Sequence, residues 1–305
     1  LIANHLPRKI GSIVLTHLLN RRGRIEIELI VVRLTEDCFY LVCAAFFEQR
    51  LIDHLNYYLM ENDLDIVVRS NKWSAIAVQG PKSRIVLADN TDAQLSNSGF
   101  QWLTARSITV AGYSVLALRI SYTGELGWEL HGPREDMLSV YAALWAAGQA
   151  YDIADYGSFA MNTMRIEKMF KGMGELTNEV TLPEADVMRF VKMDKDNFIG
   201  KTETQNSLER ELRWVCAYLR IESDGMIDGH GGEAVLFAGN VVGSITSVAY
   251  GHRVGSVLAF AYVKPCAARP GTMLQVMNAG SLNSACVLSQ PAYDPGNVLL
   301  QADSI

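Results

Sequence analysis

The chain has 305 residues, about half of them apolar and a fifth charged, which favours two folded domains with substantial cores. Its 27 lysines and arginines against 33 aspartates and glutamates give a formal net charge of -6, without a basic run. Nucleic-acid backbones bind to clustered cations, so we expect no nucleic-acid partner.

The first half of the chain predicts strands that alternate with helices. Residues 24–34 alternate apolar and acidic side chains and then become apolar, which predicts a strand with one polar face. Residues 37–46 predict its partner strand, and apolar residues at helical spacing predict an amphipathic helix over 46–62. Residues 73–87 predict a strand, a turn and a helix. A strand from about Val115 leads to helices over 133–151 and 158–170.

The pattern changes after residue 211. Short apolar runs separated by glycine turns follow at 214–221, 233–250, 256–263, 273–280 and 284–290. Regular short strands of this kind predict a small barrel or sandwich. We therefore predict an α+β domain over 1–205 and a C-terminal β domain over 206–305.

The cysteines, the histidines and the longest apolar run argue against several classes of site. The five cysteines form no CxxC pair and mostly lie in apolar runs, which predicts reduced core thiols and a reducing compartment. The six histidines form no HxH or HExxH motif, so we expect no metal site. The longest apolar run, 38–47, is shorter than the roughly 20 residues of a membrane span, so we expect no membrane partner. The chain starts without Met and without a secretory leader, and we expect that an upstream part is missing.

The stretch TGELGWEL, residues 123–130, places acids beside an indole. Gly124 and Gly127 favour a bend, and the residues after Gly127 resume a strand, so Trp128 and Glu129 point to opposite faces. A carboxylate fixed on a strand can accept two parallel N–H donors from a planar heterocycle. The alternative is a solvated acid beside a packed indole.

A second pair of acids lies on the strand of residues 24–34. Glu26 and Glu28 share one face, about 6 to 7 Å apart. Two such carboxylates can divide acid and base roles, and the alternative is again a solvated face. The glycines of 171–178 follow a predicted helix rather than a strand, so they predict no dinucleotide loop. The residues alone predict a two-part protein with an acid-lined pocket.

Several motifs in order resemble one family. They are ISYTGELGWEL (120–130), AMNTMRIEK (160–168), NEVTLPEA (178–185), VKMDKDNFIGK (191–201) and LAFAYV (258–263). In this order they resemble the folate-binding family of the glycine-cleavage aminomethyltransferase, or T-protein. Within it the chain most resembles the C-terminal half of dimethylglycine dehydrogenase and sarcosine dehydrogenase. The fold that the resemblance implies is a T-protein-like folate-binding domain followed by a small C-terminal β-barrel.

The resemblance implies a tetrahydrofolate site. The last acid of the family's TGExGxE motif, here Glu129, would hold the pterin, and the motif's tyrosine, here Tyr122, would line the same pocket. Trp128 would flank this clamp, as would Leu130 and His131. Glu28 matches the acid of a second motif and would be the catalytic base, with Leu29 and Ile30 beside it at the folate.

Two departures separate the chain from ordinary T-proteins. T-proteins have two successive aspartates where this chain has Ile27 and Glu28, and the first of them, which the resemblance implies is the catalytic one, is an isoleucine here. They also have an arginine where this chain has Met161, so the family's anchor for the glutamate tail of folate is not at that position. The dehydrogenase branch shares both changes.

The function that the resemblance implies is one-carbon transfer to tetrahydrofolate. A methylene or formaldehyde unit from oxidative N-demethylation of dimethylglycine or sarcosine would give 5,10-methylenetetrahydrofolate. FAD would belong to an upstream domain or a partner flavoprotein, and the other partners would be folate and a small methylated amine. We expect a cytoplasmic protein, or a mitochondrial-matrix protein in a eukaryote.

Besides a degenerate domain that is retained only for assembly with a partner, three alternatives stay open at this point. One is a redox-neutral tetrahydrofolate-dependent demethylase that takes an intact methyl group, with 5-methyl rather than 5,10-methylene product. The second is a glycine-cleavage-type aminomethyltransferase. The third is a folate-binding accessory protein without enzyme activity. The accessory branch has a KGCYxGQE signature, and the corresponding region here, EKMFKGMGELTNEV, lacks its cysteine, which counts against this alternative.

Overall fold

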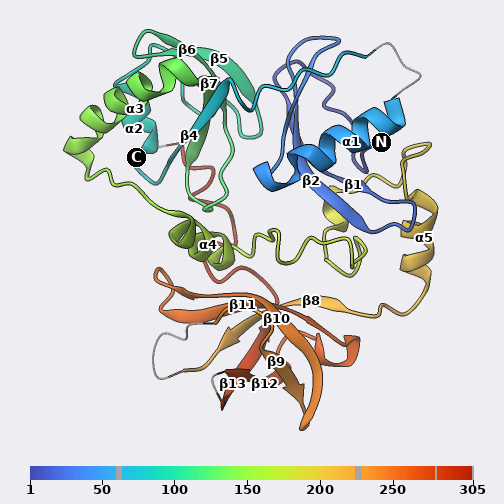
Figure 1. The fold of residues 1–305 in the computed structure, drawn as a ribbon. Coiled ribbons are helices and arrows are strands. Elements are labelled where there is room, and N and C mark those ends of the chain that lie inside the picture. Colours follow the sequence, from blue (N-terminus) through green and yellow to red (C-terminus); the bar gives the residue numbers. More distant parts are fainter. Residues whose placement is uncertain (60–63, 224–228, 279, 304–305) are drawn as a thin grey trace. The chain divides into compact units, whose positions relative to one another are not determined.

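The structure, a computed structural model, describes residues 1–59, 64–223, 229–278 and 280–303 (Figure 1). The chain forms two compact units that are discontinuous in sequence. Unit 1 contains residues 1–5, 15–29 and 157–295, and unit 2 contains residues 6–14, 30–156 and 296–305. These units divide the chain by proximity in space, and the sequence boundary near 205 stays a prediction. No helix among the described residues has the length and hydropathy that a membrane span needs.

A three-stranded sheet contributes to both units. Its order is β1 (Ile13–Leu19), β2 (Ile25–Arg33), β3 (Phe39–Val42), and β2 and β3 are the predicted pair. The turn between β1 and β2 is fixed by the side chain of Asn20, whose Oδ1 accepts hydrogen bonds from the backbone N–H groups of Arg22 and Arg24 at 2.9 and 3.2 Å. Along β2 the buried residues Ile25, Ile27 and Leu29 alternate with half-buried ones, as predicted. The run IVLTHLL of β1 has no such alternation, and the sequence did not indicate it.

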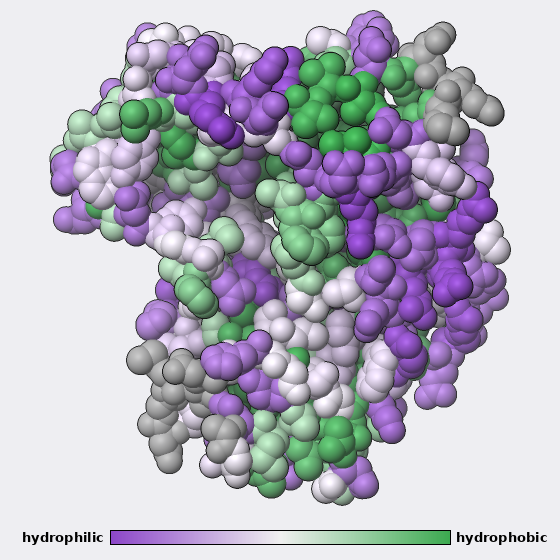
Figure 2. Space-filling view, in the orientation of Figure 1, coloured by the Kyte–Doolittle hydropathy of each residue, from purple (hydrophilic) through white to green (hydrophobic). Residues whose placement is uncertain are grey.

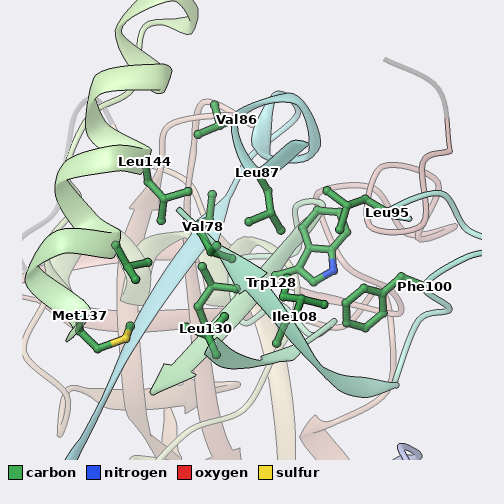
Figure 3. Close-up of a cluster of buried hydrophobic side chains, with 14 of the residues drawn as sticks. Val78, Val86, Leu87, Leu95, Phe100, Ile108, Trp128, Leu130, Met137 and Leu144 are labelled. Atoms are coloured by element: carbon green, nitrogen blue, oxygen red, sulfur yellow. The ribbon is translucent and has the colours of Figure 1, made fainter. Parts of the chain in front are cut away.

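Unit 2 is built on a four-stranded antiparallel sheet of order β4-β7-β6-β5. The strands are β4 (Trp73–Gln79), β5 (Ala105–Val110), β6 (Tyr113–Leu118) and β7 (Gly127–Pro133). Helices α2 (Ser83–Ala88) and α3 (Arg134–Gly148) pack against the sheet. Trp128 and Leu130 of β7 point into the core between sheet and helices, among Val78, Leu87, Met137 and Leu144 (Figure 3).

Helix α1 (Glu48–Leu59) lies in unit 2 and falls within the predicted helix of 46–62, whose last residues, 60–62, lie outside the described part of the chain. Large apolar side chains are exposed in the segment after it: Leu64, Ile66, Val67 and Val68. Figure 2 shows apolar side chains gathered on this part of the surface.

Unit 1 contains the C-terminal barrel. Six described strands close it in the order β10-β11-β8-β13-β12-β9, which confirms the predicted barrel and excludes the sandwich. The strands are β8 (Val215–Ile221), β9 (Ala234–Phe237), β10 (Asn240–Gly251), β11 (Ser256–Val263), β12 (Met273–Asn278) and β13 (Ser281–Leu288). Helix α4 (Ser158–Glu167) packs on β10 and β11, and α5 (Lys201–Glu209) precedes the barrel.

The cysteines are all free thiols, but only one is in the core. Cys216 is buried, whereas Cys38 and Cys266 are exposed. Burial raises the pKa of Cys216 to about 12. The prediction of core thiols is therefore wrong for Cys38 and Cys266. Cys38 lies just before β3, and Cys266 lies in the short turn Pro265–Ala267 after β11, so neither is part of a strand.

Candidate functional site

The acid-rich motif spans a loop and the start of a strand. Residues 119–126 connect β6 to β7, and Gly124 has φ +79°, a conformation that favours glycine. At Gly127 a β-carbon would lie 2.7 Å from the carbonyl oxygen of Val78, so only glycine fits where β7 begins beside β4. Tyr122 is half-buried in this loop, and Glu125 is buried. Gly124 thus lies in the predicted bend, and Gly127 begins the strand that follows it.

Trp128 and Glu129 point to opposite faces of β7, as their spacing predicts. The indole is fully buried and packs against Phe100, while the guanidinium carbons of Arg84 and Arg119 lie 5.7 and 5.6 Å from its ring centroid. The expectation that Trp128 flanks an acid clamp is wrong, because the side chains of successive strand residues lie on opposite faces.

Leu130 is also fully buried in the core that contains Trp128 (Figure 3). A ligand beside Glu129 would therefore meet Leu130 through its backbone only.

Glu129 is held by a histidine. One carboxylate oxygen, Oε2, lies 3.2 Å from Nε2 of His131, and the two side chains are 24% and 6% exposed. On the other side of the ring, Nδ1 of His131 lies 3.1 Å from the hydroxyl of Tyr40. A carboxylate can only accept, so in the neutral imidazole Nε2 carries the proton and Tyr40 donates to Nδ1. The chain Tyr40, His131, Glu129 fixes one oxygen of the acid.

Two phenols close to Glu129 keep their protons. Burial raises the pKa of Tyr40, the positive charge of Arg69 partly offsets this, and the charge of Glu129 adds to it. Burial also raises the pKa of Tyr156, again with a contribution from Glu129, and the hydroxyl of Tyr156 donates to Oε1 of Gln79 at 3.3 Å. Tyr40 is thus neutral well above pH 7 and able to donate to His131.

The second predicted acid, Glu28, belongs to unit 1. Its Oε1 lies 3.5 Å from Nε2 of His17 on the neighbouring strand, and the two side chains are 30% and 0% exposed. Glu26, two residues earlier on the same strand, instead accepts a hydrogen bond from the side chain of Asn20 at 2.8 Å. Leu29 is buried, and Ile27 is 1% exposed on the apolar side of β2.

The predicted residues fall into two groups. Tyr122, Glu129, Leu130, His131 and Ile30 belong to unit 2, whereas Glu28 and Leu29 belong to unit 1. Tyr40, Tyr156 and His17 are additional polar neighbours that the sequence did not indicate. Two surface cavities, of about 840 and 930 Å³, are lined by other residues: the first by 88–93 and parts of 106–114 in unit 2, the second by barrel residues in unit 1.

The geometry in unit 2 suits a ligand that carries N–H donors. With Oε2 turned to His131, no hydrogen bond within the described part of the chain involves the other oxygen, Oε1. A carboxylate on a rigid strand, with one oxygen fixed and one available, can accept a charge-assisted hydrogen bond from a planar heterocycle. An amino or ring N–H group of a pterin is such a donor, so this acid is compatible with tetrahydrofolate.

Comparison with known proteins identifies two matching domains. Residues 1–195 match the GCVT N-terminal domain, and residues 214–294 match the glycine cleavage T-protein C-terminal barrel domain. An aminomethyltransferase of Streptomyces coelicolor is 32% identical over 275 residues, which cover 89% of this chain and 73% of that protein. Mitochondrial dimethylglycine dehydrogenase of Mus musculus is 33% identical over 309 residues.

That alignment covers 99% of this chain but only 35% of the mouse protein, so the chain spans about a third of the length of the dehydrogenase it matches. Among solved structures, glycine cleavage system aminomethyltransferase T from Bartonella henselae has a TM-score of 0.84 at 24% identity, covering 94% of this chain and 77% of that one. This likeness shows the shared fold.

Proposed function

Because the chain belongs to the glycine cleavage T-protein family of tetrahydrofolate-dependent aminomethyltransferases, we propose that it transfers a one-carbon unit at the oxidation level of formaldehyde to tetrahydrofolate. Tetrahydrofolate supplies the N5 and N10 amines, which condense with formaldehyde to give 5,10-methylenetetrahydrofolate and water. The proposed source of the unit is oxidative N-demethylation of dimethylglycine or sarcosine. FAD would belong to another domain or to a partner flavoprotein.

Glu129 is the residue that carries this proposal. Its Oε2 is engaged by His131, so the acid offers Oε1 to one amino or ring N–H group of the pterin, rather than both oxygens to two parallel N–H donors as the sequence predicts. Holding the pterin in one orientation turns an encounter into an effectively intramolecular reaction. Tyr122 and the backbone of Leu130 would line the same site, and Tyr40 supports it through His131.

Glu28 has a different role in the proposal. Its carboxylate would accept the proton that the folate amine loses as the new bond to carbon forms, and its negative charge would stabilise the cationic character of an iminium donor. An amide at this position could orient a ligand but could do neither of these things. Leu29 and Ile30, which follow Glu28 on β2, are proposed as folate contacts beside it.

A glycine-cleavage-type reaction is the second candidate, supported by the match to the Streptomyces coelicolor aminomethyltransferase. Ile27 counts against it. This side chain is 1% exposed on the apolar side of β2, at a position where ordinary T-proteins have the first of two aspartates. A donor that needs both carboxylates would find only Glu28.

The test has a binding part and a product part. Calorimetric titration of the chain with tetrahydrofolate under anaerobic conditions should show one saturable site. Addition of formaldehyde should then give 5,10-methylenetetrahydrofolate faster than in protein-free buffer, measured by mass spectrometry of quenched samples. A chain that binds no tetrahydrofolate up to millimolar concentration would refute the proposal. Formation of 5-methyltetrahydrofolate from a methyl donor would instead support the redox-neutral demethylase.

A further inference from the structure

A second histidine contacts a proposed functional carboxylate in unit 1. His17 lies on β1, and its side chain is completely buried, with 0% exposure. Its Nε2 is 3.5 Å from Oε1 of Glu28 on β2, the strand that pairs with β1 in the sheet. Its ring packs against that of Phe190, with the centroids 6.1 Å apart.

The burial of this imidazole needs an explanation. Buried polar groups in proteins nearly always have a hydrogen-bond partner, because an unpaired one loses its hydration without compensation. Among the described residues neither Nδ1 nor Nε2 of His17 has a partner at hydrogen-bond geometry. The carboxylate of Glu28 lies within ion-pair distance of the ring.

The distance of 3.5 Å is somewhat longer than a formed hydrogen bond, for which 2.7 to 3.2 Å is usual. Hydrogen bonds of catalytic groups are often long before substrate binds and shorten in the complex. A small change in the Glu28 rotamer would bring Oε1 within reach of an Nε2–H donor. The other oxygen, Oε2, would then be the one available to a ligand.

Local chemistry separates Glu28 from the acid beside it. Glu26 lies on the same strand face, but it bonds the side chain of Asn20 in the β1–β2 turn, so its role in holding the hairpin is evident. Glu28 has the buried imidazole instead. Two acids on the same strand face therefore have different neighbours: Glu26 is hydrogen-bonded to Asn20, and Glu28 lies beside the buried imidazole of His17.

We propose that His17 is a positioning residue for Glu28: its Nε2–H donates to Oε1 and aims Oε2 at the folate amine. This inference rests on the proposed function, in which Glu28 is the base. His17 itself touches neither folate nor the one-carbon unit.

The contact can be tested without folate. The chain has six histidines, so long-range ¹H–¹⁵N correlation spectra of histidine-labelled protein are simple, and loss of a signal in His17→Gln assigns His17. We expect Nε2 of His17 to carry a proton, and we expect its resonance to move in Glu28→Gln but not in the matched control Glu26→Gln. An unprotonated Nε2, or a resonance that ignores Glu28→Gln, overturns the inference.

Two substitutions test the role of His17 in one-carbon transfer. His17→Leu removes the donor at similar volume, and His17→Gln keeps an N–H donor at similar reach. We expect His17→Leu to lower kcat about 10- to 100-fold, the scale of a misplaced reacting group, with KM for tetrahydrofolate within about twofold, and His17→Gln to restore most of the loss. Equal losses in both variants, or no loss in either, overturn the inference.

The two hypotheses fail in different ways. If the wild-type chain does not accelerate methylene transfer, the proposed function falls, while the spectra still decide whether His17 holds Glu28. If the wild-type chain is active and Nε2 of His17 has no proton, the positioning role falls and the proposed function stands. Should His17→Leu not fold, the spectra and His17→Gln decide alone.

Discussion

Replacing Glu129 with glutamine changes one atom of the side chain and tests the proposed pterin clamp directly. Glutamine keeps an oxygen that can accept from Nε2 of His131, so the contact at 3.2 Å and the fold of β7 should survive. The amide nitrogen then takes the place of Oε1. It is a donor, and it would face the amino and ring N–H donors of the pterin.

The expected loss follows from the kind of hydrogen bond that is removed. A hydrogen bond to a charged group contributes about 1.5 to 3 kcal/mol, and this range corresponds to a roughly 10- to 150-fold increase in Kd. The 24% exposure of the free side chain does not argue for a smaller value, since a docked pterin would displace that water. Calorimetric titration with tetrahydrofolate at pH 7.5 measures the effect.

The matched control is Glu135→Gln, which makes the same chemical change at an exposed position in the first turn of α3, in the same unit. We expect it to leave Kd within twofold of wild type, as is usual for an exposed acid whose charge contributes little. If Glu129→Gln also changes Kd by less than twofold, Glu129 does not hold the pterin, whatever the family of the chain.

Three further predictions test other residues. Glu28→Gln should leave Kd for tetrahydrofolate within about threefold. In a single-turnover assay it should lower the rate of methylene transfer by about 100-fold or more, the scale of a lost general base. A collapse of binding would contradict the role given to Glu28. Tyr40→Phe removes the hydroxyl that contacts His131 at 3.1 Å. Calorimetry should show a Kd for tetrahydrofolate raised about 2- to 10-fold, the effect of about 0.5 to 1.5 kcal/mol. An unchanged Kd would mean that His131 holds Glu129 without Tyr40. Asp294→Ala removes the counter-ion of the buried ammonium of Lys168, which lies 2.8 Å from the Asp294 carboxylate. It should lower the free energy of unfolding by about 3 to 5 kcal/mol in urea titrations. The control Asp196→Ala, at an exposed position, should lower it by less than about 1 kcal/mol.

Sequence reasoning succeeded where the chemistry is local. The alternation of strand side chains placed Trp128 and Glu129 on opposite faces, and the two glycines before them marked the bend. The same alternation places the indole of Trp128 on the face opposite to Glu129. The expectation that Trp128 flanks the acid was therefore wrong, and the alternation rule itself excludes it. Short strands between glycine turns indicated a barrel or a sandwich, but only part of the barrel is local. The pairings β9–β10, β10–β11 and β12–β13 join consecutive strands, whereas β11–β8, β8–β13 and β12–β9 join strands that are not consecutive in the chain.

The partners of the two acids could not be read from the sequence. Tyr40 and His131 are 91 residues apart and meet because β3 and β7 belong to the same unit, although to different sheets. The missed strand β1 carries His17, and its run of apolar residues around one histidine fits a buried helix as well as a strand. Such contacts depend on how sheets pack, which a local pattern does not encode. A histidine within an apolar run was the one available signal.

Both proposed functional carboxylates have the same kind of neighbour. Glu129 has His131 at one oxygen and Glu28 has His17, and the two imidazoles are 6% and 0% exposed. The side chain of a glutamate on a strand has several rotamers of similar energy. Restricting it to one rotamer costs conformational entropy, and a solvated acid makes no contact that offsets this cost. The hydrogen bond from His131 restricts the rotamers of Glu129 while it leaves one oxygen available, and the proposed donation from His17 would do the same for Glu28. Glu26 shows what a structural acid does instead: it bonds the side chain of a turn residue, Asn20. The pairing with a buried histidine is therefore the physical feature by which Glu28 and Glu129 differ from an acid on a solvated face, in each unit separately.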